Sequence, residues 1–448
     1  MRRPSNFFLT LAGVGGCLLA ILCVAIIIFG FVIARQQNFS LLNLTSPQTN
    51  KIVIVDNELN IALVDPRTHA VTALTKDADG GSTREYDFPT WSPDSKYVAF
   101  VSLAAVNNTP DAAVLSIRAD GSQLTRLFHT STDFPVYLYW APNSQRMSFL
   151  TQKDRSLALN LAQPDKENST QQLETGSPFY WAWSPDSQMM LLHIGGAQSD
   201  SRDAHIALLN WQTNAGPSKL SLGPASFQTP QWSPDGKQLV LAAADSTQDT
   251  LKVADARGEN ARTVVSYSGR MAFALSPAGT RIAYVATPRN VPIPTYGRLN
   301  LVNTDGTGDH QISNEETLAF FWSPDGKYIA YIIPSEAPPN NSSGSAGKAR
   351  PAAQAGALYV QWRVLEVATG SVHTVATFLP TEKFFAVLPY FDQYSRSITF
   401  WSPDSKNLVY SAQDPNDAGN GTIWVVPVNE GSKPEKITTG LAAFWSWK

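Results

Sequence analysis

The side chains that could do chemistry are scattered along this chain and form no recognised catalytic or metal-binding motif. The sequence contains no Gly-x-Ser-x-Gly elbow, phosphate-binding loop, His-Glu-x-x-His or cysteine spacing for a metal. Carboxylate pairs for glycoside hydrolysis stay open, because the separation that defines them is spatial. All six histidines are isolated from one another: His69, His129, His193, His205, His310 and His373. We therefore predict no catalytic residue, no metal site and no cofactor.

One carboxylate does recur, as the last residue of a short cassette of Trp, Ser, Pro and Asp. Pro pre-sets φ in a type I turn and Asp supplies its polar residue, so the cassette predicts a chain reversal. A Ca²⁺ site would need about six to eight oxygens at one place, whereas these carboxylates recur a repeat apart. Complete copies begin at Trp91, Trp183, Trp232, Trp322 and Trp401 and end at Asp94, Asp186, Asp235, Asp325 and Asp404, and degraded copies begin at Trp140 and Leu275. We assign these residues to architecture.

The spacing of the cassettes predicts a propeller. Successive copies are 49, 43, 49, 43, 47 and 79 residues apart, which is typical of propeller blades. Each turn leads into a run rich in β-branched and aromatic residues, such as 96–100 and 327–331. Further runs in most units complete four strands, or one blade. The cassette Trp would end the first strand, where neighbouring blades pack.

The two ends of the repeat array complement each other. Residues 52–55, 61–64 and 71–74 look like three strands of a blade that lacks its Trp-bearing strand, and residues 441–446 look like that strand. Trp445 follows Trp401 by 44 residues, in period with the other copies. We expect an all-β propeller over 51–448 with eight four-stranded blades, closed by pairing of its terminal segments. Seven or nine blades are the alternatives.

The 79-residue step contains two unusual segments. Residues 334–356 are rich in Pro, Asn, Ser, Gly and Ala, a composition that cannot bury a core, and we expect a disordered loop there. Residues 379–397 form an aromatic excursion that contains Phe384, Tyr390 and Tyr394. These three residues are candidates for a contact surface.

Aromatic residues also precede the cassettes, on the strands expected to lie nearest the central channel. Tyr137, Tyr180 and Trp181 are the candidates for ligand binding among them. Packing between blades explains most of these aromatic side chains. The alternative is an aromatic-lined channel mouth that suits a sugar or a peptide.

The N-terminus predicts a membrane anchor. Residues 7–34 form an uncharged, mostly apolar run, about 42 Å long as a helix against about 30 Å of hydrocarbon. A cleaved signal or a lipoprotein box at Cys17 fits less well. Arg2 and Arg3 favour a cytoplasmic segment 1–6. Residues 35–50 would then tether an extracytoplasmic propeller to the cell membrane.

The net charge of -3 comes with scattered charges and no basic run, so we predict no nucleic acid partner. Both cysteines, Cys17 and Cys23, lie in the apolar run, which leaves the propeller without a thiol.

The repeat resembles that of TolB-type, WD40-like β-propellers, in which Trp-Ser-Pro-Asp-Gly/Ser-Lys leads into a strand. The matching copies begin at Trp91, Trp183, Trp232, Trp322 and Trp401, and the resemblance covers about residues 50–448. It implies a propeller and a role as a partner in an envelope complex. Similar propellers cap prolyl-oligopeptidase and dipeptidyl-peptidase enzymes, but their separate hydrolase domain has no counterpart in this sequence. The predicted membrane anchor departs from the soluble TolB pattern.

Two classes of function follow. We favour a non-enzymatic, membrane-tethered binding or scaffold module whose partner is a protein or an envelope polymer. The alternative is a propeller enzyme, or a receptor for a glycan or another small ligand, that acts at the central channel. The cassette is expected to build the fold and not to touch a ligand.

Overall fold

A computed structural model describes residues 49–448, except residues 82, 107–108, 155, 196–203, 214, 226–227, 245–247, 289–295, 337–357 and 415–416. The predicted cytoplasmic segment, the membrane span and most of the tether lie outside the described residues. In the part of the chain that the structure describes, no helix has both the length and the hydropathy that crossing a membrane requires.

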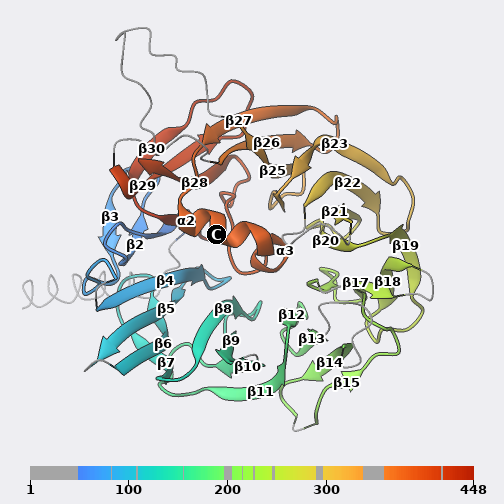
Figure 1. The fold of residues 1–448 in the computed structure, drawn as a ribbon, viewed down its shortest axis with the longest axis horizontal. Helices are drawn as coiled ribbons and strands as arrows, with labels where there is room; N and C mark the ends of the chain where they lie inside the picture. The colour runs from blue at the N-terminus through green and yellow to red at the C-terminus, as the bar shows by residue number, and fades with distance from the viewer. Residues whose placement is uncertain are drawn as a thin grey trace, which may run out of the picture. The chain divides into compact units, whose positions relative to one another are not determined.

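The described strands form eight antiparallel sheets arranged as a ring, so the prediction of an eight-bladed β-propeller is confirmed (Figure 1). Blade 1 contains β1 (Ile52–Val55), β2 (Ile61–Val64), β3 (Val71–Ala73) and β31 (Ala442–Trp445). Blade 2 contains β4 (Arg84–Trp91), β5 (Tyr97–Val106), β6 (Thr109–Arg118) and β7 (Thr125–Thr130). Blade 3 contains β8 (Phe134–Trp140), β9 (Met147–Lys153), β10 (Ser156–Ala162) and β11 (Gln171–Gly176).

The next three blades repeat this plan. Blade 4 contains β12 (Phe179–Trp183), β13 (Met189–Ile194), β14 (His205–Asn210) and β15 (Ser218–Lys219). Blade 5 contains β16 (Gln231–Trp232), β17 (Gln238–Ala244), β18 (Asp249–Asp255) and β19 (Arg262–Tyr267). Blade 6 contains β20 (Arg270–Leu275), β21 (Arg281–Thr287), β22 (Gly297–Asn303) and β23 (His310–Thr317).

The last two blades flank the long step between cassettes. Blade 7 contains β24 (Ala319–Trp322), β25 (Tyr328–Ser335), β26 (Tyr359–Glu366) and β27 (Val372–Phe378). Blade 8 contains β28 (Asn407–Asp414), β29 (Asp417–Pro427) and β30 (Glu435–Thr439), with a bridge between Trp401 and Leu408 in place of a longer inner strand. Of the loop expected over 334–356, residues 334–335 end β25, and residues 337–357 lie outside the described residues.

Ring closure follows the prediction from the chain ends. The C-terminal strand β31 pairs antiparallel with β1, which places Ile52 opposite Trp445 and Val55 opposite Ala442. Every residue of β1, β2 and β31 is buried, because the inner strands of each blade are covered by neighbouring blades on both faces. The first and last strands of the repeat array therefore close the ring by pairing within one blade.

The cassette forms the turn that its residues predict. In the first copy the Ser92 hydroxyl donates to Asp94 Oδ1 at 2.7 Å, and that oxygen accepts from the Lys96 backbone N–H at 3.1 Å. The turns also connect blades, since the Asp94 backbone N–H donates to the Ser144 hydroxyl at 3.0 Å. Asp94 thus lies in the cassette turn and accepts two of its hydrogen bonds.

The cassette tryptophans join neighbouring blades. The indole N–H of Trp140 donates to the Thr90 carbonyl at 3.3 Å, and that of Trp401 donates to the Phe321 carbonyl at 3.1 Å. In both pairs the acceptor belongs to the strand that precedes the previous cassette turn. Each such tryptophan ties its blade to the previous one, as expected for a residue at the interface between blades.

The aromatic excursion over 379–397 is helical and lies in the middle of the ring (Figure 1). It contains α2 (Glu382–Val387), the 3₁₀ helix η2 (Leu388–Tyr390) and α3 (Phe391–Tyr394). The Thr381 hydroxyl accepts from the Phe384 backbone N–H, and Glu382 lies in the first turn of α2, an arrangement that stabilises a helix N-terminus. We refer to residues 379–397 as the plug.

Candidate functional site

The plug is attached to the channel wall at several points. The Tyr137 hydroxyl of β8 donates to the Gln393 carbonyl at 2.8 Å, and the Tyr394 ring contacts the Tyr137 ring edge-on at 5.3 Å between centroids. The Thr90 hydroxyl of β4 donates to the Ser397 carbonyl. The plug therefore closes the channel with specific contacts to separate blades.

A buried carboxylate takes part in this attachment. Asp392 of α3 is 6% exposed, and its Oδ2 accepts from the Thr229 backbone N–H at 3.2 Å. Burial raises the pKa of the Asp392 carboxyl from 3.8 to about 6, and the Thr229 N–H offsets part of that rise. The ionised carboxylate is thus less favourable in the docked plug than in water.

On the cassette side the plug forms the floor of a concave site of about 470 Å³, which we call the funnel. Its floor includes Ser395 and Arg396 of the plug, together with Ile398 and Thr399, which directly follow the plug. Its walls are made mainly by residues of successive cassettes, namely the six prolines Pro142, Pro185, Pro234, Pro277, Pro324 and Pro403 and the tryptophans Trp183, Trp232, Trp322 and Trp401. The volume lies within the range of small-ligand pockets, about 300–1,000 Å³. Residues that build the fold therefore also line a cavity.

Arg396 is the one charged residue among those that line the funnel in the described chain. Its guanidinium donates to Oε1 of Gln231. Gln231 is fully buried, and its amide is oriented by a donation to the Phe273 carbonyl at 2.9 Å and by the Leu275 N–H at 2.8 Å. The wall thus holds the guanidinium in a defined place.

A smaller cavity of about 50 Å³ borders another side of the plug, lined by Asp87, Lys383 and Phe444 among others. Lys383 and Asp87 form an ion pair of 2.6 Å between the plug and β4. Because both charges are paired and the cavity holds about one or two waters, this side is a weaker candidate.

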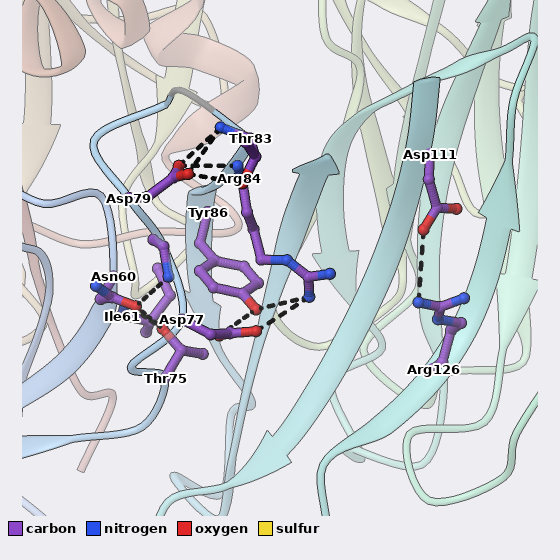
Figure 2. Close-up of polar contacts among 11 residues, drawn as sticks. Asn60, Ile61, Thr75, Asp77, Asp79, Thr83, Arg84, Tyr86, Asp111 and Arg126 are labelled. Atoms are coloured by element: carbon purple, nitrogen blue, oxygen red, sulfur yellow. Dashed lines mark hydrogen bonds and ion pairs between the residues drawn. The ribbon is translucent and has the colours of Figure 1, made fainter. Parts of the chain in front are cut away.

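A further open cavity of about 700 Å³ lies at the edge of blade 2, lined by Arg84, Arg126 and His129 among others. Both arginines already have carboxylate partners (Figure 2): Arg84 pairs with Asp77 at 3.1 Å, and Arg126 pairs with Asp111 at 3.6 Å. Their charges are largely offset. The funnel, where Arg396 forms no ion pair with a described carboxylate, is the stronger candidate.

The six residues that the sequence analysis proposed for binding differ in their exposure to solvent. Tyr137, Trp181 and Phe384 are buried at 3%, 0% and 1% exposure. Tyr180 and Tyr394 are half-buried, and Tyr390 of the plug is 46% exposed. The plug brings Tyr394 against Tyr137 and Tyr137 against Trp181. These ring contacts are part of the packing between the plug and the channel wall.

Sequence reasoning missed Arg396 and the walls of the funnel. Arg396 has no motif, and its partner Gln231 lies 165 residues away in the sequence. The plug itself did carry a signal, because Phe384, Val387, Leu388 and Phe391 have the i, i+3, i+4, i+7 spacing of a helix face. All four are buried.

Other chemistry-bearing groups are dispersed. His193 is fully buried with Nδ1 3.1 Å from the Gln228 carbonyl, and burial lowers the pKa of its imidazole to about 4. Within the described ranges, no three His, Cys, Asp or Glu side chains are grouped as a metal ion would require.

Comparison with known proteins identifies the fold. No family model matches the chain, and no curated protein matches it. An oligogalacturonate lyase in complex with manganese is 12% identical, with a TM-score of 0.50, over 85% of this chain and 98% of the lyase. Identity at this level shows a shared fold only.

Further solved propellers match less closely in TM-score. A TolB from Agrobacterium tumefaciens, described as putative, is 18% identical with a TM-score of 0.38, over 62% of this chain and 95% of that one. A puromycin hydrolase mutant is 14% identical with a TM-score of 0.43 over 66% of this chain, which spans 49% of the hydrolase. The chain is an eight-bladed β-propeller, and its solved structural neighbours include TolB propellers.

Proposed function

We propose that this chain is a membrane-anchored, extracytoplasmic binding module that holds a protein or an envelope polymer in the funnel without chemically changing it. The observation that carries the proposal is the funnel itself, a concave site with walls of proline and tryptophan and a floor made by the plug. The accessible apolar surface of these walls comes from the exposed prolines and the half-buried Trp322, because Trp183, Trp232 and Trp401 are at most 8% exposed. Such walls suit binding.

The composition of the funnel supports binding over catalysis. Within the described chain, its lining residues include no carboxylate, imidazole or thiol. General acid–base catalysis most often uses such groups, and a serine or threonine hydroxyl needs an adjacent base to act as a nucleophile. Arg396 can orient or hold a ligand, but it stays protonated and does not act as a base.

The proposed location rests on the N-terminal sequence. Residues 7–34 are long and apolar enough for a span, and Arg2 and Arg3 favour a cytoplasmic N-terminus. A fusion of alkaline phosphatase after residue 448 tests this, since that enzyme is active only where disulfides form. Activity, together with retention in carbonate-washed membranes, supports the anchor. An inactive fusion, or release by carbonate, would contradict it.

Photocrosslinking tests the binding site in membranes. A photoreactive amino acid replaces the exposed funnel residue Pro324 or, as a control, Ser218 on the outer strand β15. Position two of a type I turn accepts most residues, so the turn at Pro324 tolerates the exchange. Adducts that form from position 324 and not from 218 support the funnel. Adducts from 218 alone would place the binding surface elsewhere.

A further inference from the structure

We propose that the funnel receives the free C-terminal end of a partner polypeptide, with the terminal carboxylate paired to Arg396. This inference rests on the proposed function and names its ligand. It follows from three features of the funnel: the charge on its floor, the character of its walls and its closure by the plug.

The floor presents a single cation that has no ion-pair partner among the described carboxylates. Arg396 is half-buried, and the buried Gln231 holds one edge of its guanidinium. The remaining donors of the guanidinium fork match the two oxygens of a carboxylate. Because the surrounding walls are largely apolar, this pairing is stronger than the same contact in water.

The apolar walls of the funnel favour a ligand that has apolar surface as well as a negative charge. Six prolines and four cassette tryptophans surround the space above Arg396, and proline offers no backbone N–H to a ligand. The hydroxyl-bearing residues among those that line it are Tyr139, Ser276, Ser323, Ser395, Thr399 and Ser446. A small acid would leave the walls uncovered, whereas an extended peptide with apolar residues fills the funnel and reaches its floor.

The plug decides which part of a polypeptide can enter. Phe384 and Phe391 are each 1% exposed within the channel, so a chain cannot pass through the ring. An internal segment would have to enter and leave by the same mouth. A chain end needs to pass the mouth only once, and its carboxylate supplies the ion-pair partner that Arg396 does not have among the described carboxylates.

The test uses the full-length protein in detergent micelles and an equimolar library of fluorescein-labelled hexapeptides with a free C-terminus. All six positions of the hexapeptides are varied over apolar residues. Peptides captured by the immobilised protein are identified by mass spectrometry. Each is then resynthesised as the free acid and as the C-terminal amide, and Kd is measured by fluorescence anisotropy. The free acid should bind at least 10-fold more tightly than the amide, because a charge-assisted hydrogen bond is lost.

Variants assign the preference to one side chain. In Arg396→Gln the acid and the amide should bind with equal Kd, and Arg396→Lys should keep part of the preference, since the charge remains without the planar fork. Arg146→Gln is the matched control, because Arg146 lies over the Trp211 ring and not among the funnel residues. It should leave the preference unchanged. Circular dichroism and the melting temperature check the fold of each variant.

The outcomes separate this inference from the proposed function. Equal binding of acid and amide by the wild-type protein overturns carboxylate recognition, and funnel crosslinking from position 324 still supports the binding module. An amidated peptide with an internal Asp that binds as tightly as the free acid overturns the chain-end assignment. Failure of every peptide to bind, while position 324 crosslinks a partner in membranes, also overturns it. If position 324 formed no crosslinked adduct in membranes, that result would contradict the proposed function.

Discussion

The Tyr137 hydroxyl and the Gln393 carbonyl form a hydrogen bond of 2.8 Å between residues 256 positions apart. Tyr137 belongs to the inner strand of blade 3, and Gln393 belongs to helix α3 of the plug. The bond is buried, and the Tyr394 ring packs against the same tyrosine. The plug is therefore joined to the wall by a directed polar contact as well as by apolar packing.

Removing this hydroxyl should weaken the plug measurably. Tyr137→Phe is expected to lower the free energy of unfolding by about 1 kcal/mol, the usual net value of a hydrogen bond. The loss stays modest because the Gln393 carbonyl still accepts from the Arg396 backbone N–H at 3.2 Å. Urea denaturation measures the change. Tyr97→Phe is the control, because no described residue forms a hydrogen bond with that hydroxyl. An equal loss in both variants would contradict the role of the bond.

A buried serine should be more critical than its size suggests. Ser148 Oγ accepts from the indole N–H groups of Trp181 at 2.9 Å and Trp183 at 3.0 Å, and it donates to the Tyr139 carbonyl at 2.8 Å. Ser148→Ala strands two buried donors, which should cost about 2–4 kcal/mol.

Ser116 provides the matched control for this change. It is also fully buried, on β6 of blade 2, but its hydroxyl has no hydrogen-bond partner in the described structure. Ser116→Ala should therefore be neutral or slightly stabilising. Thermal denaturation of both variants, followed by tryptophan fluorescence, checks the difference, and similar melting temperatures would refute the explanation.

The propeller could be predicted because each blade repeats the same short turn motif followed by strands. The cassette turn at Asp94 depends on residues within five positions of one another. The truncated cassette copy at Trp445 marks the strand that closes the ring. Both signals are local and recur with a fixed period. Local turn chemistry and periodicity are the features that a single sequence records best.

The plug and the funnel could not be predicted in the same way. Helices α2 and α3 have six and four residues, and helices this short depend on tertiary packing for their stability. Pro389 further obscures the apolar spacing around it. The position of Arg396 depends on Gln231, a contact that no local pattern encodes. Residues brought together by ring closure leave no mark in the linear sequence.

The plug should make stability depend on pH. The pKa of Asp392 is about 6 in the folded protein against an ordinary 3.8, so folding favours the protonated carboxyl. Its contribution is complete below about pH 4 and is lost as the pH rises through 6. Relative to Asp392→Asn, the wild-type protein should lose up to roughly 3 kcal/mol between pH 4 and pH 7. Urea denaturation across this range measures the difference between the two proteins.

An exposed carboxylate offers a control of opposite sign. The Ser233 hydroxyl lowers the pKa of Asp235, so this group stabilises the fold at higher pH and loses that effect as the pH falls. Asp235→Asn should therefore change the dependence of the unfolding free energy on pH only at acidic pH. A wild-type profile parallel to that of Asp392→Asn between pH 4 and pH 7 would show that Asp392 is not the titrating group.

Strand β31, which closes the ring, should control how strongly the amides of β1 are protected from hydrogen exchange. Trp445 is 2% exposed and lies opposite Ile52 in the pairing of β31 with β1. Trp445→Ala should cost about 3–5 kcal/mol, as large-to-small changes at buried aromatic residues do. Because the damage lies at the closure, amide hydrogen exchange should accelerate in β1 more than in β5, which pairs within its own blade. Phe134→Ala, at a site 41% exposed, should change neither strand. Equal acceleration in β1 and β5 would mean that the ring unfolds as a whole and that β31 does not act as a local closure.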